Sequence, residues 1–331
     1  MIRVGLLGAG FMGRVHAQAW AKIEEAELVA VAGLPKAAAA ELASFLGGRA
    51  TDSIEEILAD VHVDVVDICL PTDLHEEYVI RSLQAGKHVL CEKPLALSLE
   101  SADRIFQVAE RSGKVLMVAQ VVRFWPEYLA AHSLVSGRSI GQLKALRASR
   151  TSKRPDWGDW FSDPSRTGGA LFDLHIHDLD YVVWLLGRPR SVFALGLQSA
   201  SGGWDHVCSQ LDYGHAVAAV EASYRMPDAY PFSTDLRLLC EKGLLEYQFR
   251  VKGNVEERGS ADSRLWMITD AGITYPEVPE KDGYLGEIEH FLECVKKGLP
   301  SDRVPNSEVR LVMEVVEALR HSLESGVRVD F

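Results

Sequence analysis

The sequence predicts an α/β protein with two domains, in which a doubly wound parallel sheet is followed by an α+β domain with an open, mainly antiparallel sheet. Three observations predict this fold class. Short apolar strands alternate with helical segments up to residue 118. A glycine-rich turn joins the first strand to the first helix. Beyond Arg123, β-type runs separated by turn residues dominate the chain.

The first domain is predicted over residues 1–122. Its strands are expected at residues 2–7, 28–32, 63–70, 88–91 and 115–118. Its first helix follows the glycine turn and is expected to end near Lys22. Three more helices are expected at residues 36–46, 74–85 and 98–112. Strands that alternate with helices are joined by right-handed crossovers, which place helices on both faces of a parallel sheet.

The second domain is predicted over residues 123–331, with a boundary that rests on the change of pattern alone. One helix is expected over residues 169–186, followed by strands at residues 192–197, 206–212, 216–224, 235–240 and 244–249. Tyr213-Gly214 predicts a hairpin turn. Two helices, at residues 284–297 and 307–325, complete the domain.

The composition argues against several classes of protein. The chain of 331 residues carries 35 basic and 47 acidic residues, a net charge of −12 without a basic block, which argues against nucleic-acid binding. It lacks an apolar run of about 20 residues for a membrane helix, and it begins with a strand instead of a signal sequence, so we expect a cytoplasmic protein. Its five cysteines form no C-x-x-C pair, so we expect neither disulfides nor a metal site.

The glycines of the first turn match the requirements of a dinucleotide-binding Rossmann fold. Gly8 allows a tight turn, Gly10 lets backbone N–H groups approach a pyrophosphate, and Gly13 permits close packing of helix against strand. The helix N-terminus, with Phe11 and Met12, then faces the phosphates with its positive dipole end. A glycine turn without a ligand is the alternative, but its place between a strand and a helix favours NAD(P).

The end of the second strand bears on the choice between NAD and NADP. Proteins that bind NAD usually carry an Asp or Glu there for the adenosine 2′-hydroxyl, whereas this chain has Gly33-Leu34-Pro35-Lys36. With no carboxylate to repel a 2′-phosphate and with Lys36 placed to pair with it, the sequence leans towards NADP. The alternative is that Lys36 only opens an exposed helix.

One lysine is a candidate for acid–base chemistry. Lys93 follows the strand that ends at Cys91, which places it at the carboxyl edge of the sheet, and Pro94 stiffens the chain after it. An ammonium group held there stabilises a developing alkoxide and lowers the pKa of a substrate hydroxyl. The alternative is that Lys93 is a solvated surface lysine.

A histidine lies in a segment rich in His and Asp. Read as one helix, Asp173, His177, Asp180 and Trp184 fall at i, i+4, i+7 and i+11 and form a polar face. Histidine is the usual base for removing a proton near neutral pH, so His177 is predicted to take this role. Two alternatives stay open: a buried structural histidine, and a metal site formed with His175.

With these motifs in place, the chain resembles the Gfo/Idh/MocA family (glucose-fructose oxidoreductase, inositol dehydrogenase and rhizopine catabolism) nearly end to end. The resemblance rests on five motifs: the glycine turn of residues 8–13, Pro71-Thr72-Asp73-Leu74-His75, Cys91-Glu92-Lys93-Pro94, Arg123-Phe124-Trp125-Pro126, and the G-G-x-x-x-D-x-x-x-H-x-x-D element of residues 168–180. Together these motifs are specific to the family.

The resemblance implies roles for individual residues. It implies Lys93 and His177 as catalytic residues, with Asp173 as their substrate-binding and orienting partner. It implies a cofactor crevice lined by Pro71, Thr72, His75 and Glu92. It also implies homodimers or homotetramers built through the open face of the second sheet.

The chain departs from the family pattern in two places. The strand-two carboxylate is missing, which leaves the cofactor preference open. Gln120-Val121-Val122 stands where relatives often carry an asparagine just before the Arg-Phe pair, which weakens inference about the substrate.

The predicted function is an NAD(P)-dependent oxidoreductase that transfers a hydride between the nicotinamide and a secondary alcohol or carbonyl of a sugar, cyclitol or related polyol. The side chains expected to bind substrate are Lys93, Arg123, Trp157, Trp160, Asp173 and His177. The two tryptophans either stack on a sugar ring or anchor a loop.

Two other functions stay open. One is an NAD-dependent glycosidase that uses the same hydride step transiently, and the other is a non-enzymatic NAD(P)-binding transcriptional co-regulator. The presence of both Lys93 and His177 argues against the co-regulator, because a sensor needs neither.

Overall fold

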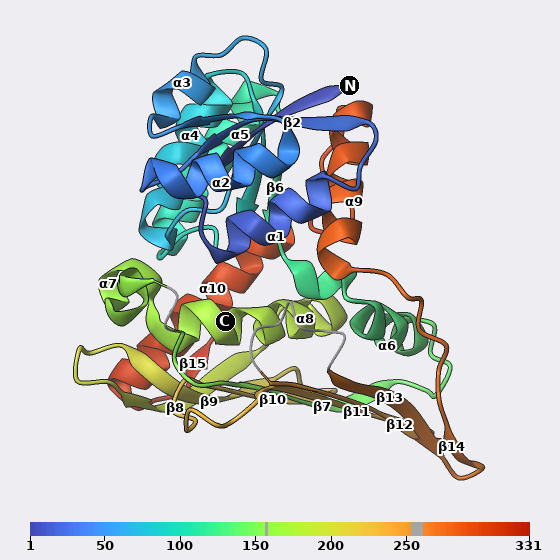
Figure 1. The fold of residues 1–331 in the computed structure, drawn as a ribbon. Coiled ribbons are helices and arrows are strands. Elements are labelled where there is room, and N and C mark those ends of the chain that lie inside the picture. The colour runs from blue at the N-terminus through green and yellow to red at the C-terminus, as the bar shows by residue number, and fades with distance from the viewer. Residues whose placement is uncertain (156–157, 253–260) are drawn as a thin grey trace. The chain divides into compact units, whose positions relative to one another are not determined.

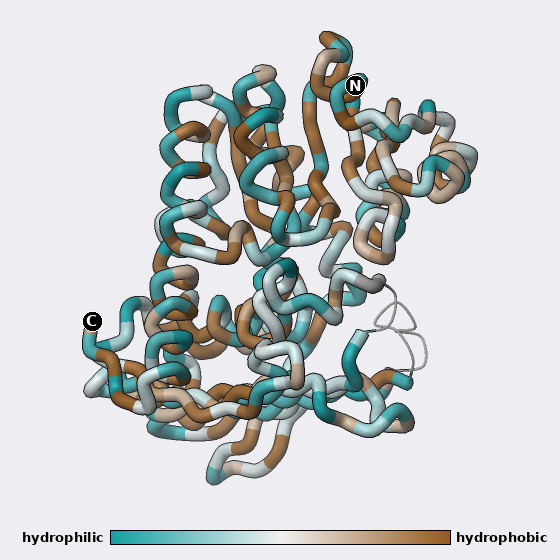
Figure 2. Tube along the Cα trace, turned by 90° about the vertical axis from the view of Figure 1, so that its left-hand side faces the viewer, coloured by the Kyte–Doolittle hydropathy of each residue, from teal (hydrophilic) through white to brown (hydrophobic). Residues whose placement is uncertain are grey.

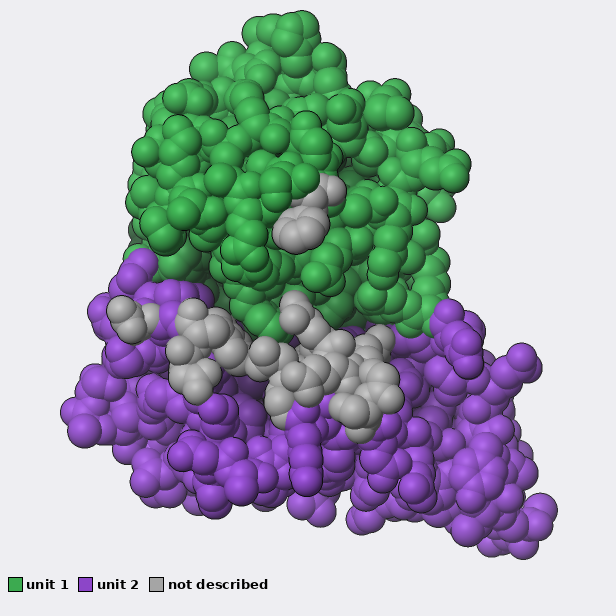
Figure 3. All heavy atoms as spheres, in the orientation of Figure 1, with its two compact units in different colours: residues 1–124, 281–310 green, residues 125–280, 311–331 purple. Residues whose placement is uncertain are grey.

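The chain divides into two compact units, which Figure 3 shows in different colours. The computed structural model describes residues 1–155, 158–252 and 261–331. The first unit comprises residues 1–124 and 281–310, and the second comprises residues 125–280 and 311–331. The division after Phe124 lies two positions beyond the predicted boundary, whereas residues 281–310 join the first unit and not the second.

A C-terminal helix explains this difference. Helix α9 (Gly283–Lys297) packs against helix α1 (Phe11–Trp20) of the first unit and buries Ile288 and Phe291. An ion pair between Lys296 and Glu25 adds to the contact. The sequence pattern predicts the helix itself but does not identify the surface that its apolar side covers.

The first unit is built on a parallel sheet, as predicted. Within the described residues its strand order is β3-β2-β1-β4-β5-β6. The chain adds strands on one side of β1 as far as β3 and on the other side from β4 onwards, so the topological switch point lies between β1 and β4. The strands are β1 (Ile2–Leu7), β2 (Ala26–Ala32), β3 (Arg49–Thr51), β4 (Val65–Ile68), β5 (His88–Glu92) and β6 (Leu116–Ala119). The short edge strand β3 is absent from the sequence prediction.

Helices cover both faces of this sheet, as Figure 1 shows. Besides α1 and α9 they are α2 (Lys36–Leu46), α3 (Ile54–Leu58), α4 (His75–Gln84) and α5 (Leu99–Ser112). All four residues of β4 are buried, as expected for a strand covered on both sides. Figure 2 shows the matching hydrophobic stretches along the strands of this unit.

The second unit holds the mainly antiparallel sheet, which confirms the predicted fold class. In its described residues the strand order is β14-β13-β12-β11-β7-β10-β9-β8-β15, and β7 and β10 form the one parallel pair. The strands are β7 (Leu143–Thr151), β8 (Ser191–Gln198), β9 (Trp204–Asp212), β10 (Val217–Ser223), β11 (Phe232–Cys240), β12 (Gly243–Val251), β13 (Asp262–Thr269), β14 (Gly272–Thr274) and β15 (Val329–Asp330). The central strand β7 is absent from the sequence prediction.

Helices lie against one face of the second sheet. These are α6 (Pro126–Ser136), α7 (Pro164–Thr167), α8 (Ile176–Leu186) and the C-terminal part of α10 (Asn306–Ser325). Along β9, buried residues alternate with more exposed ones, so the two faces of the strand have different surroundings. Among the described residues, no helix is both long and apolar enough to cross a membrane.

The predicted helix over residues 169–186 consists of two pieces. A π-helical turn, Leu171–His175, precedes α8. Because a π turn takes more residues per turn, it changes the phase on which the predicted polar face depended. Asp173 and His177 are partly exposed as expected, but Asp180 is fully buried, which corrects its place on that face.

Candidate active site

The glycine turn between β1 and α1 has the shape that a dinucleotide needs. Gly8 has φ +109°, and a Cβ there would lie 2.2 Å from the carbonyl oxygen of Cys69. A Cβ at Gly13 would lie 2.0 Å from the carbonyl oxygen of Gly8, so any side chain would separate helix from strand. Gly10 is exposed, with open space within 4 Å of its Cβ position among the described residues. The turn therefore fits a pyrophosphate at the start of α1.

Lys36, the predicted partner of a 2′-phosphate, lies at the start of α2. It is the first residue of that helix, four positions after the last residue of β2, and it is exposed. Arg14 of α1 forms an ion pair with Glu41 of α2, which joins the two helices on either side of β2's end. Phe11 and Met12, at the start of α1, are partly exposed.

The loop after β4 is tied to the loop after β5 by a buried histidine. The Nδ1 atom of His75 lies 2.8 Å from the carbonyl oxygen of Pro94, and its Nε2 atom lies 2.8 Å from that of Leu70. Burial lowers the pKa of His75. Thr72 is buried and Pro71 partly exposed beside it. One ring nitrogen of His75 thus lies beside a carbonyl oxygen of each loop, so we expect His75 to hold the shape of the two loops at the crevice.

Lys93 follows the last residue of β5 and is partly exposed. Its backbone N–H donates to Oε2 of Glu92 at 2.9 Å, while Oε1 of Glu92 lies 3.2 Å from Nε2 of His16. Burial raises the pKa of Glu92, but the hydrogen bond and the charge of His16 outweigh it and lower that pKa. The buried Glu92 therefore stays ionised.

His16 and Asp67 were missed by sequence reasoning. His16 of α1 is fully buried, and its Nδ1 lies 3.0 Å from Oδ2 of Asp67 on β4, which also accepts a hydrogen bond of 2.7 Å from Trp20. Burial is the largest single influence on the pKa of His16 and lowers it, but the charges and hydrogen bonds of its neighbours, Asp67 foremost, together raise that pKa well above 6.5. The signal that could have identified this cluster is Asp67, an aspartate inside an otherwise apolar strand.

In the second unit, Asp173 is held by a tyrosine. The hydroxyl of Tyr224, the residue after β10, donates to the carboxylate of Asp173. Tyr224 is buried in a cluster with Ala170 and Leu174, and this packing holds its ring in place. His177 is the second residue of α8 and is partly exposed. Sequence reasoning missed Tyr224, because nothing in the local pattern links it to Asp173.

His175 is more deeply buried than His177. It is fully buried, and its Nε2 lies 2.8 Å from the hydroxyl oxygen of Ser209. Among the described residues, its Nδ1 has no hydrogen-bond partner. Burial lowers the pKa of His175 to about 3, so the ring is neutral at ordinary pH. His175 is therefore a structural histidine of the second unit.

The structure changes the set of expected substrate contacts. Arg123 is fully enclosed and donates to the carbonyl oxygen of Arg303 and to the carboxylate of Glu308. A side chain enclosed by its own chain offers no surface to a substrate, so we remove Arg123 from the set. Trp160 packs against Phe161 with ring centroids 4.1 Å apart, and Trp157 lies outside the described residues.

Two groups of described residues have the composition of a metal site. His16, Asp67 and Cys69 lie in the first unit, and His206, Cys208 and Glu221 lie on β9 and β10 in the second. In each group the ligand atoms lie within 4.8 Å of one another. In the first group, His16 and Asp67 are already hydrogen bonded to each other. The second group joins neighbouring strands, which cysteine spacing along the chain does not reveal.

Comparison with family models matches most of both halves of the chain. Residues 2–120 match the model described as "Oxidoreductase family, NAD-binding Rossmann fold". Residues 128–246 match the model described as "GFO/IDH/MocA C-terminal domain". The two matches meet near the division that separates the units.

Individual relatives align over nearly the whole chain. D-xylose 1-dehydrogenase (NADP(+)) 2 of Haloferax volcanii is 30% identical over 333 residues, covering 98% of each chain. Inositol 2-dehydrogenase of Rhizobium meliloti is 30% identical over 310 residues, covering 90% of this chain and 89% of the relative. The crystal structure of GenD2 from gentamicin A biosynthesis, in complex with NAD, matches with a TM-score of 0.85 at 26% identity, covering 100% of this chain and 96% of that one.

Proposed function

The chain belongs to the Gfo/Idh/MocA family of NAD(P)-dependent oxidoreductases, and from this premise we propose that it interconverts a secondary alcohol and a carbonyl group on a sugar, cyclitol or related polyol. It is an enzyme that acts on CH–OH groups. The two relatives are named for D-xylose and inositol, which supports this substrate class. The observation that carries the proposal is Lys93, placed directly after β5 at the carboxyl edge of the dinucleotide-binding sheet.

We assign separate tasks to three side chains. The ammonium group of Lys93 stabilises negative charge on the reacting substrate oxygen. The partly exposed imidazole of His177 accepts the hydroxyl proton in one direction and returns it in the other. Asp173, whose carboxylate is held by Tyr224, binds the substrate and orients it. The bound NAD(P) supplies or accepts the hydride.

The cofactor is assigned to the first unit. Gly8, Gly10 and Gly13 shape the turn that receives the pyrophosphate. Phe11, Met12, Pro71, Thr72, Glu92 and Lys93 complete the proposed cofactor set, with His75 supporting the two loops. We also propose a preference for NADP, because Lys36 is exposed at the end of β2, where this chain carries no carboxylate.

The test of the reaction uses purified protein with NAD⁺ or NADP⁺ and a panel of aldoses and inositols. We expect a sugar-dependent rise in nicotinamide absorbance. Lys93→Ala and His177→Ala should each lower kcat by about 10²–10⁴-fold. The exposed residues Lys242 and His215 provide matched alanine controls that should keep the wild-type rate. Absence of turnover on the whole panel, or wild-type rates in both catalytic variants, would contradict the proposal.

The same assay separates the two other functions. Release of an aglycone from a glycoside without net cofactor reduction would favour the glycosidase. Dinucleotide binding without any turnover, together with capture of a transcription factor, would favour the co-regulator. The names of the two relatives support a dehydrogenase over both.

The cofactor preference is tested by calorimetric titration of NAD⁺ and NADP⁺ side by side. Lys36→Ala should weaken NADP⁺ binding by about 10-fold or more, the effect of losing one charge-assisted hydrogen bond, and should leave NAD⁺ binding unchanged. Equal affinity of the variant and the wild type for NADP⁺ would remove Lys36 from the site.

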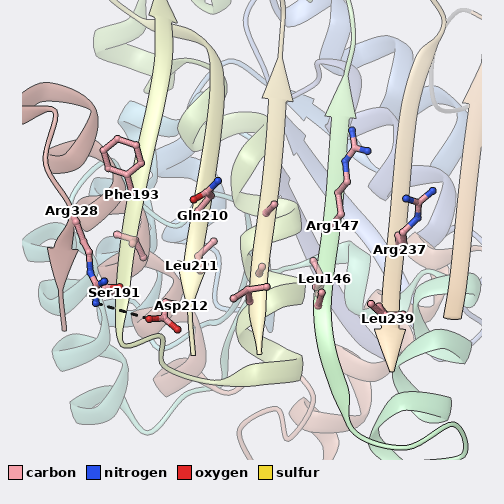
Figure 4. Close-up of a pocket in the computed structure, with 15 residues that line it drawn as sticks. Leu146, Arg147, Ser191, Phe193, Gln210, Leu211, Asp212, Arg237, Leu239 and Arg328 are labelled. Carbon is pink, nitrogen blue, oxygen red and sulfur yellow. Dashed lines mark ion pairs between the residues drawn. The ribbon is translucent and has the colours of Figure 1, made fainter. Parts of the chain in front are cut away.

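We further propose that the outer face of the second sheet joins two copies of the chain. Leu195, Leu197, Val217 and Leu239 on this face are each about half exposed, at 62%, 55%, 55% and 48%. Figure 4 shows the central part of this face, where apolar side chains lie beside Arg147 and Arg237. A large apolar surface of this kind is typical of a protein–protein contact.

The assembly is tested by light scattering of the purified protein. We expect a dimer or tetramer, and Leu195→Asp with Val217→Asp should give a folded monomer, because two charges would have to be buried in the contact. A monomeric wild type would contradict this proposal.

A further inference from the structure

A buried cluster of charged groups underlies the carboxyl edge of the first sheet. Its members come from three elements: His16 from α1, Asp67 from β4 and Glu92 from the end of β5. We call them the His16 cluster. His16 lies between the two carboxylates, at 3.0 Å from Asp67 and 3.2 Å from Glu92. All three residues are buried, with exposed fractions of 0%, 0% and 6%.

The charges of this cluster balance only if His16 is protonated. Two carboxylates inside a protein are costly unless positive groups lie beside them. An imidazolium compensates one of them, and Lys93, whose charge acts on Glu92, compensates the other. The indole N–H of Trp20 donates to Oδ2 of Asp67, the same oxygen that lies 3.0 Å from His16, and the backbone N–H of Lys93 donates to Oε2 of Glu92.

Further titratable side chains lie on the strands and on the helix packed around α1. The thiols of Cys69 and Cys91 are buried, and burial raises the pKa of both, so they stay neutral. Helix α9, which packs against α1, contributes Tyr284, whose ring centroid lies 6.3 Å from that of His16. The same helix carries the buried carboxyl group of Glu287.

We propose that His16 is a positioning residue for Lys93, acting as an imidazolium that is held by Asp67 and that locks Glu92 between its own ring and the Lys93 backbone. Each oxygen of Glu92 has a separate task in this arrangement. Oε1 contacts the ring of His16, and Oε2 receives the backbone N–H of Lys93. A fixed Glu92 therefore fixes the peptide from which the Lys93 side chain extends. The inference rests on the catalytic role proposed for Lys93.

The first test compares turnover in three variants. His16→Gln keeps a polar side chain but removes the positive charge, and should lower kcat by about 10–100-fold with little change in KM, because a small displacement of a catalytic group has this effect. Adding Asp67→Asn removes one negative charge and should restore most of the lost kcat. His88→Gln is the matched control, since His88 is at the other end of β5, where it accepts a hydrogen bond from Val115, and it should keep the wild-type rate.

The second test reads the charge of the ring directly. Nitrogen-15 NMR of histidine-labelled wild-type protein, with the signal assigned by its loss in His16→Gln, should show both ring nitrogens of His16 protonated at about pH 8. This measurement is made on wild-type protein without substrate, and a variant serves only to assign the signal. If His16→Gln fails to fold, the shift of the same signal in Asp67→Asn provides the assignment.

These outcomes decide the inference separately from the proposed reaction. A neutral His16 ring at about pH 8, a wild-type kcat in His16→Gln, or a loss that Asp67→Asn fails to recover would each overturn it. Lys93→Ala is measured alongside. If Lys93→Ala keeps full activity, the proposed function fails; if Lys93→Ala is inactive while His16→Gln is unaffected, only the positioning role fails.

Discussion

Each of the two units contains a fully buried histidine, but the ring in the first unit is positively charged and the ring in the second is neutral. His16 in the first unit lies between Asp67 and Glu92, and its pKa is raised well above 6.5 because the charges and hydrogen bonds of its neighbours, Asp67 foremost, together outweigh burial. Among the described residues, the side chain of His175 in the second unit forms a hydrogen bond only with the hydroxyl of Ser209, and burial lowers its pKa to about 3. Equal burial therefore gives opposite protonation states, and the partner decides which one.

The two histidines also differ in their relation to the proposed reaction. The charged histidine lies beneath Lys93, where an electrostatic field at the carboxyl edge is useful to the proposed reaction. The neutral histidine precedes His177 by two residues and fills the core under α8.

The largest effect is expected from the second unit's own buried ion pair. Arg150 of β7 donates to both oxygens of Asp178 at 3.0 Å, and both residues are buried. Arg150→Met should destabilise the protein by about 3–5 kcal/mol, because Asp178 is left as an uncompensated buried charge. Urea unfolding followed by fluorescence measures this.

The double variant Arg150→Met with Asp178→Leu is the control for that experiment. Replacing both members of a buried pair by apolar residues should recover most of the lost stability. If the double variant is as unstable as the single one, packing and not charge explains the loss.

The acid side of the stability profile should depend on His175. The unfolded chain binds a proton on this residue below pH 6.5, whereas the folded protein does so only near pH 3, so stability falls as the pH drops from 6.5 towards 3. The expected loss between pH 6.5 and pH 5 is about 2 kcal/mol. His175→Gln should flatten this slope, and a slope unchanged by the substitution would contradict the assignment.

The alkaline side should depend on His16 with the opposite sign. Because its folded-state pKa is raised, the stability that its protonation contributes is fully present below pH 6.5 and is lost as the pH rises through the raised pKa. Urea midpoints measured from pH 7 upwards should therefore decrease in the wild type. The variant His16→Gln with Asp67→Asn, which has no imidazole there to titrate, should lose this dependence.

The smallest effect is expected at the hydroxyl that faces His175. Ser209→Ala removes the only described hydrogen bond of the His175 side chain and should cost about 1–3 kcal/mol, the penalty for leaving a buried polar group unpaired. The ring should stay neutral, because burial and not the serine lowers its pKa. A charged His175 in this variant, read by NMR at pH 7, would show that the serine controls its protonation.

Local motifs were predicted most completely. The turn at Gly8 and the position of Lys93 after a strand depend on a few neighbouring residues, so their spacing along the chain was sufficient. The alternating strands and helices of the first unit followed from hydrophobic periodicity in the same way. Strand β7 was missed because most of its residues, including Arg150, are buried and polar ones interrupt the alternation.

Interactions between distant residues account for the rest. His16 meets partners 51 and 76 positions away, and Arg123 bonds to a carbonyl group 180 positions away. Periodicity identifies which positions are buried, but it carries no information about which polar groups meet inside the core. The amino-acid pattern therefore specified the nucleotide turn and the fold class, whereas the packing of helices and strands chose the charge of each buried histidine, because that charge depends on neighbours that only folding brings together.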